Sequence, residues 1–346
     1  MTPASETEIP SWMKAIVQDR YGGADRLRLQ SVSTPNPEPG EVLVRVRAAA
    51  ICKGDVHLMT GRPYLVRTMF GLLRPKNRVI GQEVAGTVVA AGSDVLRLKV
   101  GDEVFGPVGH GAFAEYVRAP ESRLAHKPAS LGFEPAAAIG DSALAALQSL
   151  RDAGGARSGH QVLIHGASGG VGTFAVQIAR ALGARVTAVC STRHVELMSE
   201  IGANRVIDYT LGDLAGQADT RFDVILDMVG NRSLEEFRSL LSERGVLVAL
   251  AGPPGHDWIG PLLWMLSTSR ANRRGPQTFK TFLVETRQED LVVLADWATQ
   301  GALSPVIEQT LPLEEAPKAM RHVATGHARG KTVLEVKSVA KTKATR

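Results

Sequence analysis

The feature that most constrains the fold is a glycine-rich turn near the middle of the chain. Residues 162–165 are apolar like a short buried strand, and residues 171–182 have the period of an amphipathic helix. Between them lies the sequence Gly-Ala-Ser-Gly-Gly-Val-Gly, residues 166–172. A strand that passes through such a turn into a helix is typical of the first unit of a dinucleotide-binding sheet.

Each glycine of this turn has a structural role that a larger residue could not fill. Gly166, Gly169 and Gly172 permit a tight turn, close approach of the backbone to a pyrophosphate, and close packing of helix on strand. The amides at the start of the helix would face the phosphates. The predicted cofactor-binding residues of the turn are Gly166, Ala167, Ser168, Gly169, Gly170, Val171 and Gly172.

Strands and helices alternate on both sides of the turn. This alternation predicts an α/β domain with a doubly wound parallel (Rossmann) sheet over residues 135–274. The expected helices cover 135–150, 171–182 and 195–201, and the expected strands cover 162–165, 185–190, 206–207, 224–227 and 245–251.

The rest of the chain is predicted to form a second, β-rich domain. Short strands separated by turn residues fill residues 13–134, and strand-like segments reappear after about residue 270. We therefore expect one barrel-like domain made of 13–134 plus 275–336. Residues 1–12 are expected to be an N-terminal tail, and the basic residues 337–346 a C-terminal tail.

The strand that follows the turn helix carries a signal for cofactor specificity. An enzyme selective for NAD commonly has a carboxylate at the end of this strand, against the ribose 2′-hydroxyl. The sequence there has Ser191, Thr192 and Arg193 instead. Hydroxyls and a guanidinium suit a 2′-phosphate, so NADPH is predicted rather than NADH. The alternative is that Arg193 only opens a solvated helix.

Composition excludes several other classes of protein. The 346 residues fit two domains, and no apolar run approaches the roughly twenty residues of a membrane span. Cys52 and Cys190 are most simply free thiols of a reducing cytoplasm. The basic cluster of Arg270, Arg273 and Arg274 has no interleaved aromatic residues, so no nucleic-acid partner is expected. We expect a cytoplasmic protein with a small-molecule substrate and no membrane partner.

Six short motifs together resemble the medium-chain dehydrogenase/reductases, and within them the quinone oxidoreductase and enone reductase branch. The resemblance runs from Met13 to about Glu335. It implies a split-barrel (GroES-like) catalytic domain with the Rossmann domain inserted in it, the nicotinamide in the cleft between them, and a homodimer. The motifs are Pro-Gly-Glu-Val-Leu-Val (39–44), Gly-Gln-Glu-Val-Ala-Gly (81–86), Val-Gly-Asp-Glu-Val (100–104), Gly-Ala-Phe-Ala-Glu-Tyr (111–116), the turn 166–172, and Gly330-Lys331.

The resemblance also implies further cofactor-binding residues. Tyr209 is expected to approach the 2′-phosphate, with a half-buried tyrosine at a strand end as the alternative. A loop of Gly252, Pro253 and Gly255 is expected near the nicotinamide ribose. The additional candidates for cofactor binding are Gly252, Phe279, Gly330 and Lys331.

Zinc-dependent members of the family have a histidine where this chain has Gln82. A neutral carboxamide is a poor ligand for Zn²⁺, so we predict no metal. The alternative is a rearranged zinc site made of Cys52, Glu83 and Asp141. Without a Lewis acid, alcohol oxidation lacks its usual route to an alkoxide, which favours reduction of an activated double bond.

The predicted activity is NADPH-dependent hydride transfer to an enone, enoyl or quinone substrate without zinc. The candidate catalytic residues, placed by resemblance, are Cys52, Asp55, Tyr64 and Asp141, and Tyr64 is the best hydroxyl donor to a substrate oxygen. For Asp55, a structural hydrogen-bonding role is the alternative. Two other functions stay open: a zinc-dependent alcohol dehydrogenase with unusual ligands, and an NADPH-binding protein without catalysis.

Overall fold

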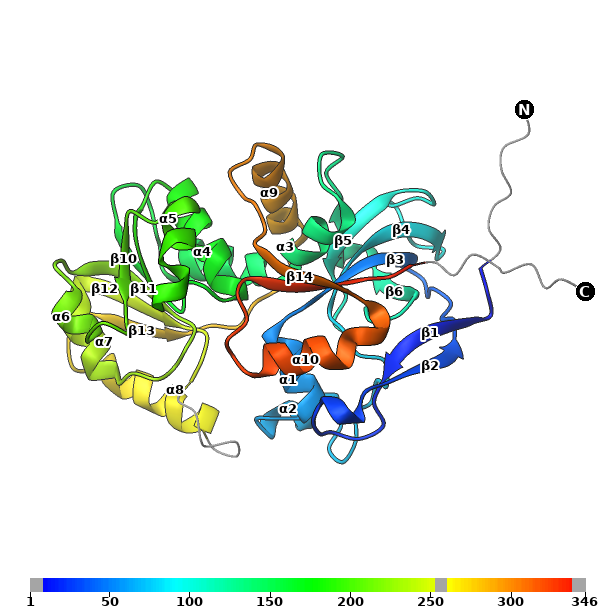
Figure 1. Cartoon of the computed structure of the whole chain (residues 1–346), viewed down its shortest axis with the longest axis horizontal. Coiled ribbons are helices and arrows are strands. Elements are labelled where there is room, and N and C mark those ends of the chain that lie inside the picture. The colour runs from blue at the N-terminus through cyan, green and yellow to red at the C-terminus, as the bar shows by residue number, and fades with distance from the viewer. Residues whose placement is uncertain (1–8, 253–259, 338–346) are drawn as a thin grey trace, which may run out of the picture.

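The computed structural model describes residues 9–252 and 260–337. Figure 1 shows two parts side by side: a sheet with its helices at the left and a β-rich part at the right. The helix α3 (Phe133–Gln148) lies at their junction and contacts α4 on one side and β3, β4 and β5 on the other. It is an alanine-rich helix buried along most of its length, so both parts pack on its surface.

The β-rich part is built on a sheet that joins the two ends of the chain. Along β3, Val44 and Val46 are buried while Arg45 and Arg47 are not, the alternation of a strand with one face in a core. The sheet order is β14-β15-β3-β4-β5-β7, with β6 paired to β3. The strands are β3 (Glu41–Ile51), β4 (Glu83–Ala91), β5 (Glu103–Pro107), β6 (Tyr116–Pro120), β7 (Ala125–His126), β14 (Ile307–Pro312) and β15 (Lys331–Glu335).

Smaller elements complete this part. β1 (Trp12–Val17) and β2 (Arg28–Ser33) form an antiparallel pair. The helices α1 (Lys53–Thr60) and α2 (Leu65–Phe70) follow β3, and α10 (Ala316–Ala324) connects β14 to β15. In Figure 1, α1 and α2 lie below α10 at the lower edge of the molecule.

The second part is a six-stranded parallel sheet in the order β10-β9-β8-β11-β12-β13. The order reverses between β8 and β11, and this place is the switch point of the sheet. In doubly wound sheets, ligands bind at the switch point, beyond the carboxyl ends of the strands. The strands are β8 (Gln161–His165), β9 (Arg185–Cys190), β10 (Arg205–Asp208), β11 (Phe222–Asp227), β12 (Leu241–Ala249) and β13 (Thr278–Thr281). The associated helices are α4 (Gly170–Ala181), α5 (Val195–Glu200), α6 (Leu214–Gln217), α7 (Leu234–Leu240) and α8 (Gly260–Ala271).

This arrangement confirms the predicted fold class, a doubly wound sheet inserted in a β-rich part. One predicted boundary is wrong. β13 lies within the predicted catalytic segment 275–336, yet it pairs with β12 in the parallel sheet. α9 (Gln288–Thr299) contacts α3 and β7, so we propose that the chain crosses back between β13 and α9. The sequence did not separate the two sheets here because β13 has only four residues, too few for a clear pattern of apolar positions.

Among the described residues, no helix combines the length and the apolar character that a membrane crossing requires.

Candidate functional site

The glycine turn has the geometry that its sequence predicts. It leaves β8 at Gly166, whose φ of 89° lies in the left-handed region that favours glycine. A side chain at Gly172 would come within 2.3 Å of the carbonyl oxygen of Gly166. Gly169 is the N-cap of α4, so the free amides of the first helical turn point out of the helix end beside the switch point. Ser168, Gly169 and Gly170 are partly exposed at this helix end, whereas Ala167 and Gly172 are buried beneath them.

The neighbouring strand ends support this turn. His165 Nδ1 lies 2.8 Å from Asp227 Oδ1, and both side chains are buried. Asp227 also accepts hydrogen bonds from the amides of Val229 and Gly230, which fixes the loop after β11. A side chain at Gly230 would come within 2.4 Å of the carbonyl oxygen of Gly252, so the loops after β11 and β12 touch. The expected positions Pro253 and Gly255 lie outside the described residues.

A carboxylate at the end of β10 lies beside the end of β9, a neighbourhood that the sequence did not reveal. Thr192 Oγ1 donates a hydrogen bond of 2.5 Å to Asp208 at the end of β10, and Thr210 Oγ1 donates another. These hydrogen bonds, that of Thr192 first, hold the pKa of Asp208 below its ordinary value. Tyr209 follows and is half exposed. An ionised carboxylate therefore lies beside the residues predicted to bind a 2′-phosphate.

Two guanidinium groups approach the same place from different parts of the chain. Arg193 and Arg329 are both exposed, and neither side chain has a hydrogen bond or ion pair within residues 9–252 and 260–337. The imidazole of His194 has its pKa lowered first by burial and then by the charges of Arg193 and Arg329. The next residue, Gly330, donates its amide to the carbonyl of Ser168 at 2.8 Å, tying this segment to the glycine turn. Sequence reasoning missed Arg329, although it directly precedes Gly330-Lys331.

Beneath the turn lies a buried ion pair. Lys331 is 1% exposed, and its Nζ donates to Glu83 Oε2 at 2.7 Å and to Ser142 Oγ at 2.8 Å. The other oxygen of Glu83 accepts the amide of Ser142 at 3.2 Å. A Cβ at Gly170 would lie 3.4 Å from Lys331 Cδ, so the lysine stem passes directly under the turn. Lys331 therefore lies beside the cofactor site, as expected, but its ammonium is directed to Glu83 and not outward to a phosphate.

Charge states in this pair follow from burial. Burial raises the pKa of Glu83 to about 7, while Lys331 acts to lower it. Burial alone would lower the pKa of Lys331, but Glu83 and its neighbours raise it overall. The ammonium is thus the stable cation of the cluster at neutral pH.

Three of the four candidate catalytic residues surround this ion pair. Asp55 Oδ2 accepts the amide of Cys52 at 2.8 Å and so caps α1. Burial raises the pKa of Asp55 to about 6, and burial first, then Asp55, raise the pKa of the Cys52 thiol well above its usual value. Asp141 follows Gly140, whose non-helical backbone interrupts α3, and burial raises its pKa as well. For Asp55, the capping geometry supports the structural alternative.

The fourth candidate, Tyr64, is the N-cap residue of α2 and is half-buried. The guanidinium of Arg67 lies 4.6 Å from the centre of its ring and 4.7 Å from the centre of the Tyr21 ring. These contacts fix the ring face. Tyr64 is not one of the residues that contact the Lys331 ammonium.

Phe279 does not fit the predicted contact with the cofactor. It is 2% exposed and packs in a core cluster with Phe222 and Phe237, under the guanidinium of Arg238. β13 is the outermost strand beyond β12, away from the switch point at β8 and β11. The prediction for Phe279 is therefore wrong, because its strand belongs to the parallel sheet and not to the returning β-rich part.

The candidate ligands of a rearranged zinc site do lie together. One atom from each of Cys52, Glu83 and Asp141 lies within 4.8 Å of the others. However, the Lys331 ammonium already occupies one Glu83 oxygen, and the nearby Gln82 offers only a neutral amide that donates toward Cys52 and Asp55. A divalent cation would have to displace an ammonium that has no other carboxylate within hydrogen-bond distance among the described residues. Zinc binding by these residues would therefore require the loss of the ion pair between Glu83 and Lys331.

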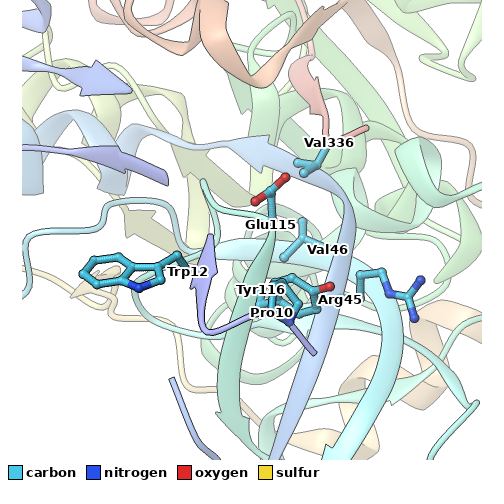
Figure 2. A pocket seen from close by; sticks show the side chains of 7 residues that line it. All are labelled: Pro10, Trp12, Arg45, Val46, Glu115, Tyr116 and Val336. Atoms are coloured by element: carbon cyan, nitrogen blue, oxygen red, sulfur yellow. The ribbon is translucent and has the colours of Figure 1, made fainter. Parts of the chain in front are cut away.

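A separate pocket lies elsewhere on the β-rich part. Figure 2 shows it lined by side chains that include Trp12, Arg45 and Tyr116. Arg45 is seven residues from Cys52 along the extended β3, which is roughly 20 Å. This pocket is therefore distinct from the glycine turn and the buried ion pair.

Comparison with known proteins agrees with this geometry. Residues 38–129 match the alcohol dehydrogenase GroES-like domain family, and residues 201–334 match the zinc-binding dehydrogenase family. The chain is 35% identical to the mitochondrial NAD(P)H oxidoreductase RTN4IP1 of Mus musculus, over 97% of this chain and 91% of that protein. It is 32% identical to the 2-methylene-furan-3-one reductase of Solanum lycopersicum, over 96% of this chain and 81% of that protein. A structure of the Escherichia coli quinone oxidoreductase complexed with NADPH matches with a TM-score of 0.79 and 25% identity, over 93% of this chain and 99% of that chain.

The fold and the glycine turn, together with these matches, define a reductase that uses a nicotinamide cofactor. The chain belongs to the medium-chain dehydrogenase/reductase superfamily, in its quinone oxidoreductase branch, as the sequence motifs predicted.

Proposed function

We propose that the protein is an NADPH-dependent reductase that transfers hydride to an activated double bond of an enone, enoyl or quinone substrate without zinc. The observation that carries the proposal is the Lys331 ammonium held 2.7 Å from Glu83, where zinc-dependent relatives are expected to hold their metal. A cation supplied by the chain itself offers no open coordination position, so it cannot activate an alcohol as a Lewis acid.

The residues present fit a nicotinamide dinucleotide. The glycine turn offers amides and space for the pyrophosphate, and the switch point between β8 and β11 offers the crevice. NADPH would supply the hydride once bound. What the chain must add is orientation, exclusion of water, and a hydrogen-bond donor for the carbonyl oxygen that gains negative charge. Tyr64 is our candidate for that donor.

The preference for NADPH rests on a balance of charges. Arg193 and Arg329 offer two guanidinium groups without partners among the described residues, while Asp208 offers one carboxylate. The hydroxyls of Thr192 and Thr210 already bind that carboxylate, which leaves it less available to a ribose hydroxyl. Two cations against one hydrogen-bonded anion favour a 2′-phosphate.

One observation favours a second candidate, a zinc-dependent alcohol dehydrogenase. The ligand atoms of Cys52, Glu83 and Asp141 are close enough to share an ion. That function requires Lys331 to leave Glu83 and the Cys52 thiol to ionise against its raised pKa.

Oxidation of NADPH with a panel of quinones, enones, ketones and alcohols, on protein whose metal content is measured, tests the proposal. We expect turnover of quinones or enones by protein that contains less than stoichiometric zinc. Zinc at one ion per chain with alcohol or ketone activity would establish the second candidate. Tight binding of NADPH without turnover of any substrate would support a protein that binds the cofactor and does no chemistry.

Replacing Tyr64 with Phe is expected to lower turnover by about tenfold to a hundredfold, because the variant lacks a donor for the developing oxyanion. The dissociation constant of NADPH should stay unchanged. Steady-state kinetics and a cofactor titration measure the two effects separately. Tyr116→Phe, in the distinct pocket of Figure 2, is the matched control. Unchanged turnover in Tyr64→Phe would remove Tyr64 from the mechanism.

A further inference from the structure

The segment that contains α2 exposes an unusual group of apolar side chains. Five large apolar residues within nine positions are exposed, and the two at the end, Leu72 and Leu73, are 69% and 87% exposed. Elsewhere in the described residues, exposed large apolar side chains occur singly or in pairs along the sequence. A contiguous exposed apolar patch on a soluble protein usually marks a surface that something else covers. The five residues are Leu65, Met69, Phe70, Leu72 and Leu73.

The fold holds this patch in place. Gly71 has a φ of 121°, and a side chain there would come within 2.1 Å of the carbonyl oxygen of Arg74, so the chain turns tightly after α2. The amide of Lys76 closes the loop by donating to the carbonyl of Phe70 at 2.8 Å. Tyr21 Oη donates to the carbonyl of Gly71 at 2.6 Å and anchors the loop to the body of the protein. Leu72 and Leu73 therefore form the tip of a closed loop and are not a frayed end.

The charge of the same segment has a single sign. Residues 62–78 contain five basic residues and no acidic residue. Arg67 donates to the carbonyl of Gly61, and Arg78 pairs with Asp19. Arg74 and Lys76, which follow the tip, are exposed and have no side-chain hydrogen bond or ion pair within the described part of the chain. Two exposed leucines followed by two unpaired cations are complementary to a surface that has an apolar interior and an anionic face.

We propose that this loop docks the protein on an anionic lipid bilayer, with Leu72 and Leu73 entering the interfacial layer and Arg74 and Lys76 contacting the headgroups. Amphipathic surface segments bind membranes through this combination of apolar burial and attraction to anionic lipid. A protein partner is an outcome of the test below, since Met69, Phe70 and Arg74 are residue types that protein interfaces favour. The basic residues of the segment, with no acidic residue among them, favour anionic lipid. The docking does not depend on the proposed reductase function. It departs from the sequence-based expectation of no membrane partner, and it involves no membrane-spanning helix among the described residues.

Flotation of the full chain with vesicles tests the docking. We expect the protein to float with vesicles of phosphatidylcholine that contain phosphatidylglycerol, and not with phosphatidylcholine alone, and we expect salt to weaken the binding. Leu72→Ser/Leu73→Ser and Arg74→Gln/Lys76→Gln should each lower the bound fraction by about tenfold, since the first removes apolar burial and the second removes two charges. Leu96→Ser is the matched control, because Leu96 is 89% exposed on another loop.

A second control separates the loop from the basic end of the chain. Lys341→Gln/Lys343→Gln should leave vesicle binding in place. The proposal is overturned if the wild-type chain does not bind anionic vesicles, or if the Leu72→Ser/Leu73→Ser variant binds as well as wild type. Sedimentation velocity adds a further outcome: if the same variant dissociates a wild-type dimer, a second copy of the chain covers the loop and lipid does not. All of these measurements are made without substrate, so failure of the proposed reductase activity would leave them interpretable.

Discussion

Replacing Glu83 with Gln is expected to lower the free energy of unfolding by about 3–5 kcal/mol, because the change leaves the buried ammonium of Lys331 without its counter-ion. Lys331→Met should cost less. The remaining Glu83 carboxyl, with its pKa already raised to about 7 by burial, can take up a proton and become neutral. The double variant Glu83→Gln/Lys331→Met should recover most of the loss, since neither member of the ion pair is left without its partner. Urea denaturation of all four proteins gives the coupling energy as a double-mutant cycle.

An exposed ion pair provides the control for this cycle. Lys318 Nζ lies 2.8 Å from Glu315 on the surface of the β-rich part, and both side chains are largely exposed. Removing either partner should change stability by less than about 1 kcal/mol. If Glu83→Gln costs no more than Glu315→Gln, then the buried pair is not the charge centre that we infer, and the argument against zinc weakens with it.

Replacing Arg193 or Arg329 with Ala is expected to raise the dissociation constant of NADPH by about tenfold or more, while that of NADH changes by less than about threefold. Only NADPH has a 2′-phosphate, and a charge-assisted hydrogen bond to it is worth roughly 1.5–3 kcal/mol before solvent screening. Fluorescence titration with each cofactor measures the two constants. Arg28→Ala, on the exposed face of β2, is the control for loss of a surface charge.

The opposite result would assign Asp208 the leading role. If both arginine variants lose NADPH and NADH equally, and Asp208→Asn weakens NADH, then the carboxylate at the end of β10 selects the cofactor and the protein prefers NADH. If Arg193→Ala weakens the binding of both cofactors equally while Arg329→Ala weakens only NADPH, then the 2′-phosphate contacts only the returning segment that contains Arg329.

The sequence predicts the cofactor turn well because its signal lies in the backbone. Gly166 has a positive φ, and Gly172 lies too close to the backbone of the turn for a side chain. Both requirements select glycine, and glycines at this spacing can be recognised in the sequence. The doubly wound sheet was predictable for a similar reason, since its buried strands read as apolar runs between helices. These local patterns do not require knowledge of which strand lies beside which.

The parts that the sequence could not predict depend on contacts between distant segments. Asp208 reaches Thr192 only because β10 pairs with β9, and Arg329 reaches the same region only because the chain returns there. The position of Lys331 near the turn followed from family resemblance, but the direction of its ammonium followed from the placement of Glu83, 248 residues earlier. Phe279 was misassigned for the same reason, because a four-residue strand does not reveal which sheet it joins.

The separation between Glu83 and Lys331 has a consequence for synthesis of the chain. β4, with Glu83 at its first residue, is made 248 residues before Lys331 at the start of β15, and all strands of the parallel sheet are made between them. Until Lys331 is made, the β-rich part lacks both its completing strand and the cation for its buried carboxylate. We therefore expect the part with the parallel sheet to fold first, and the β-rich part to stay open to chaperones during translation. A nascent chain stalled before residue 331 should therefore contain one protease-resistant half beside one that is readily cut.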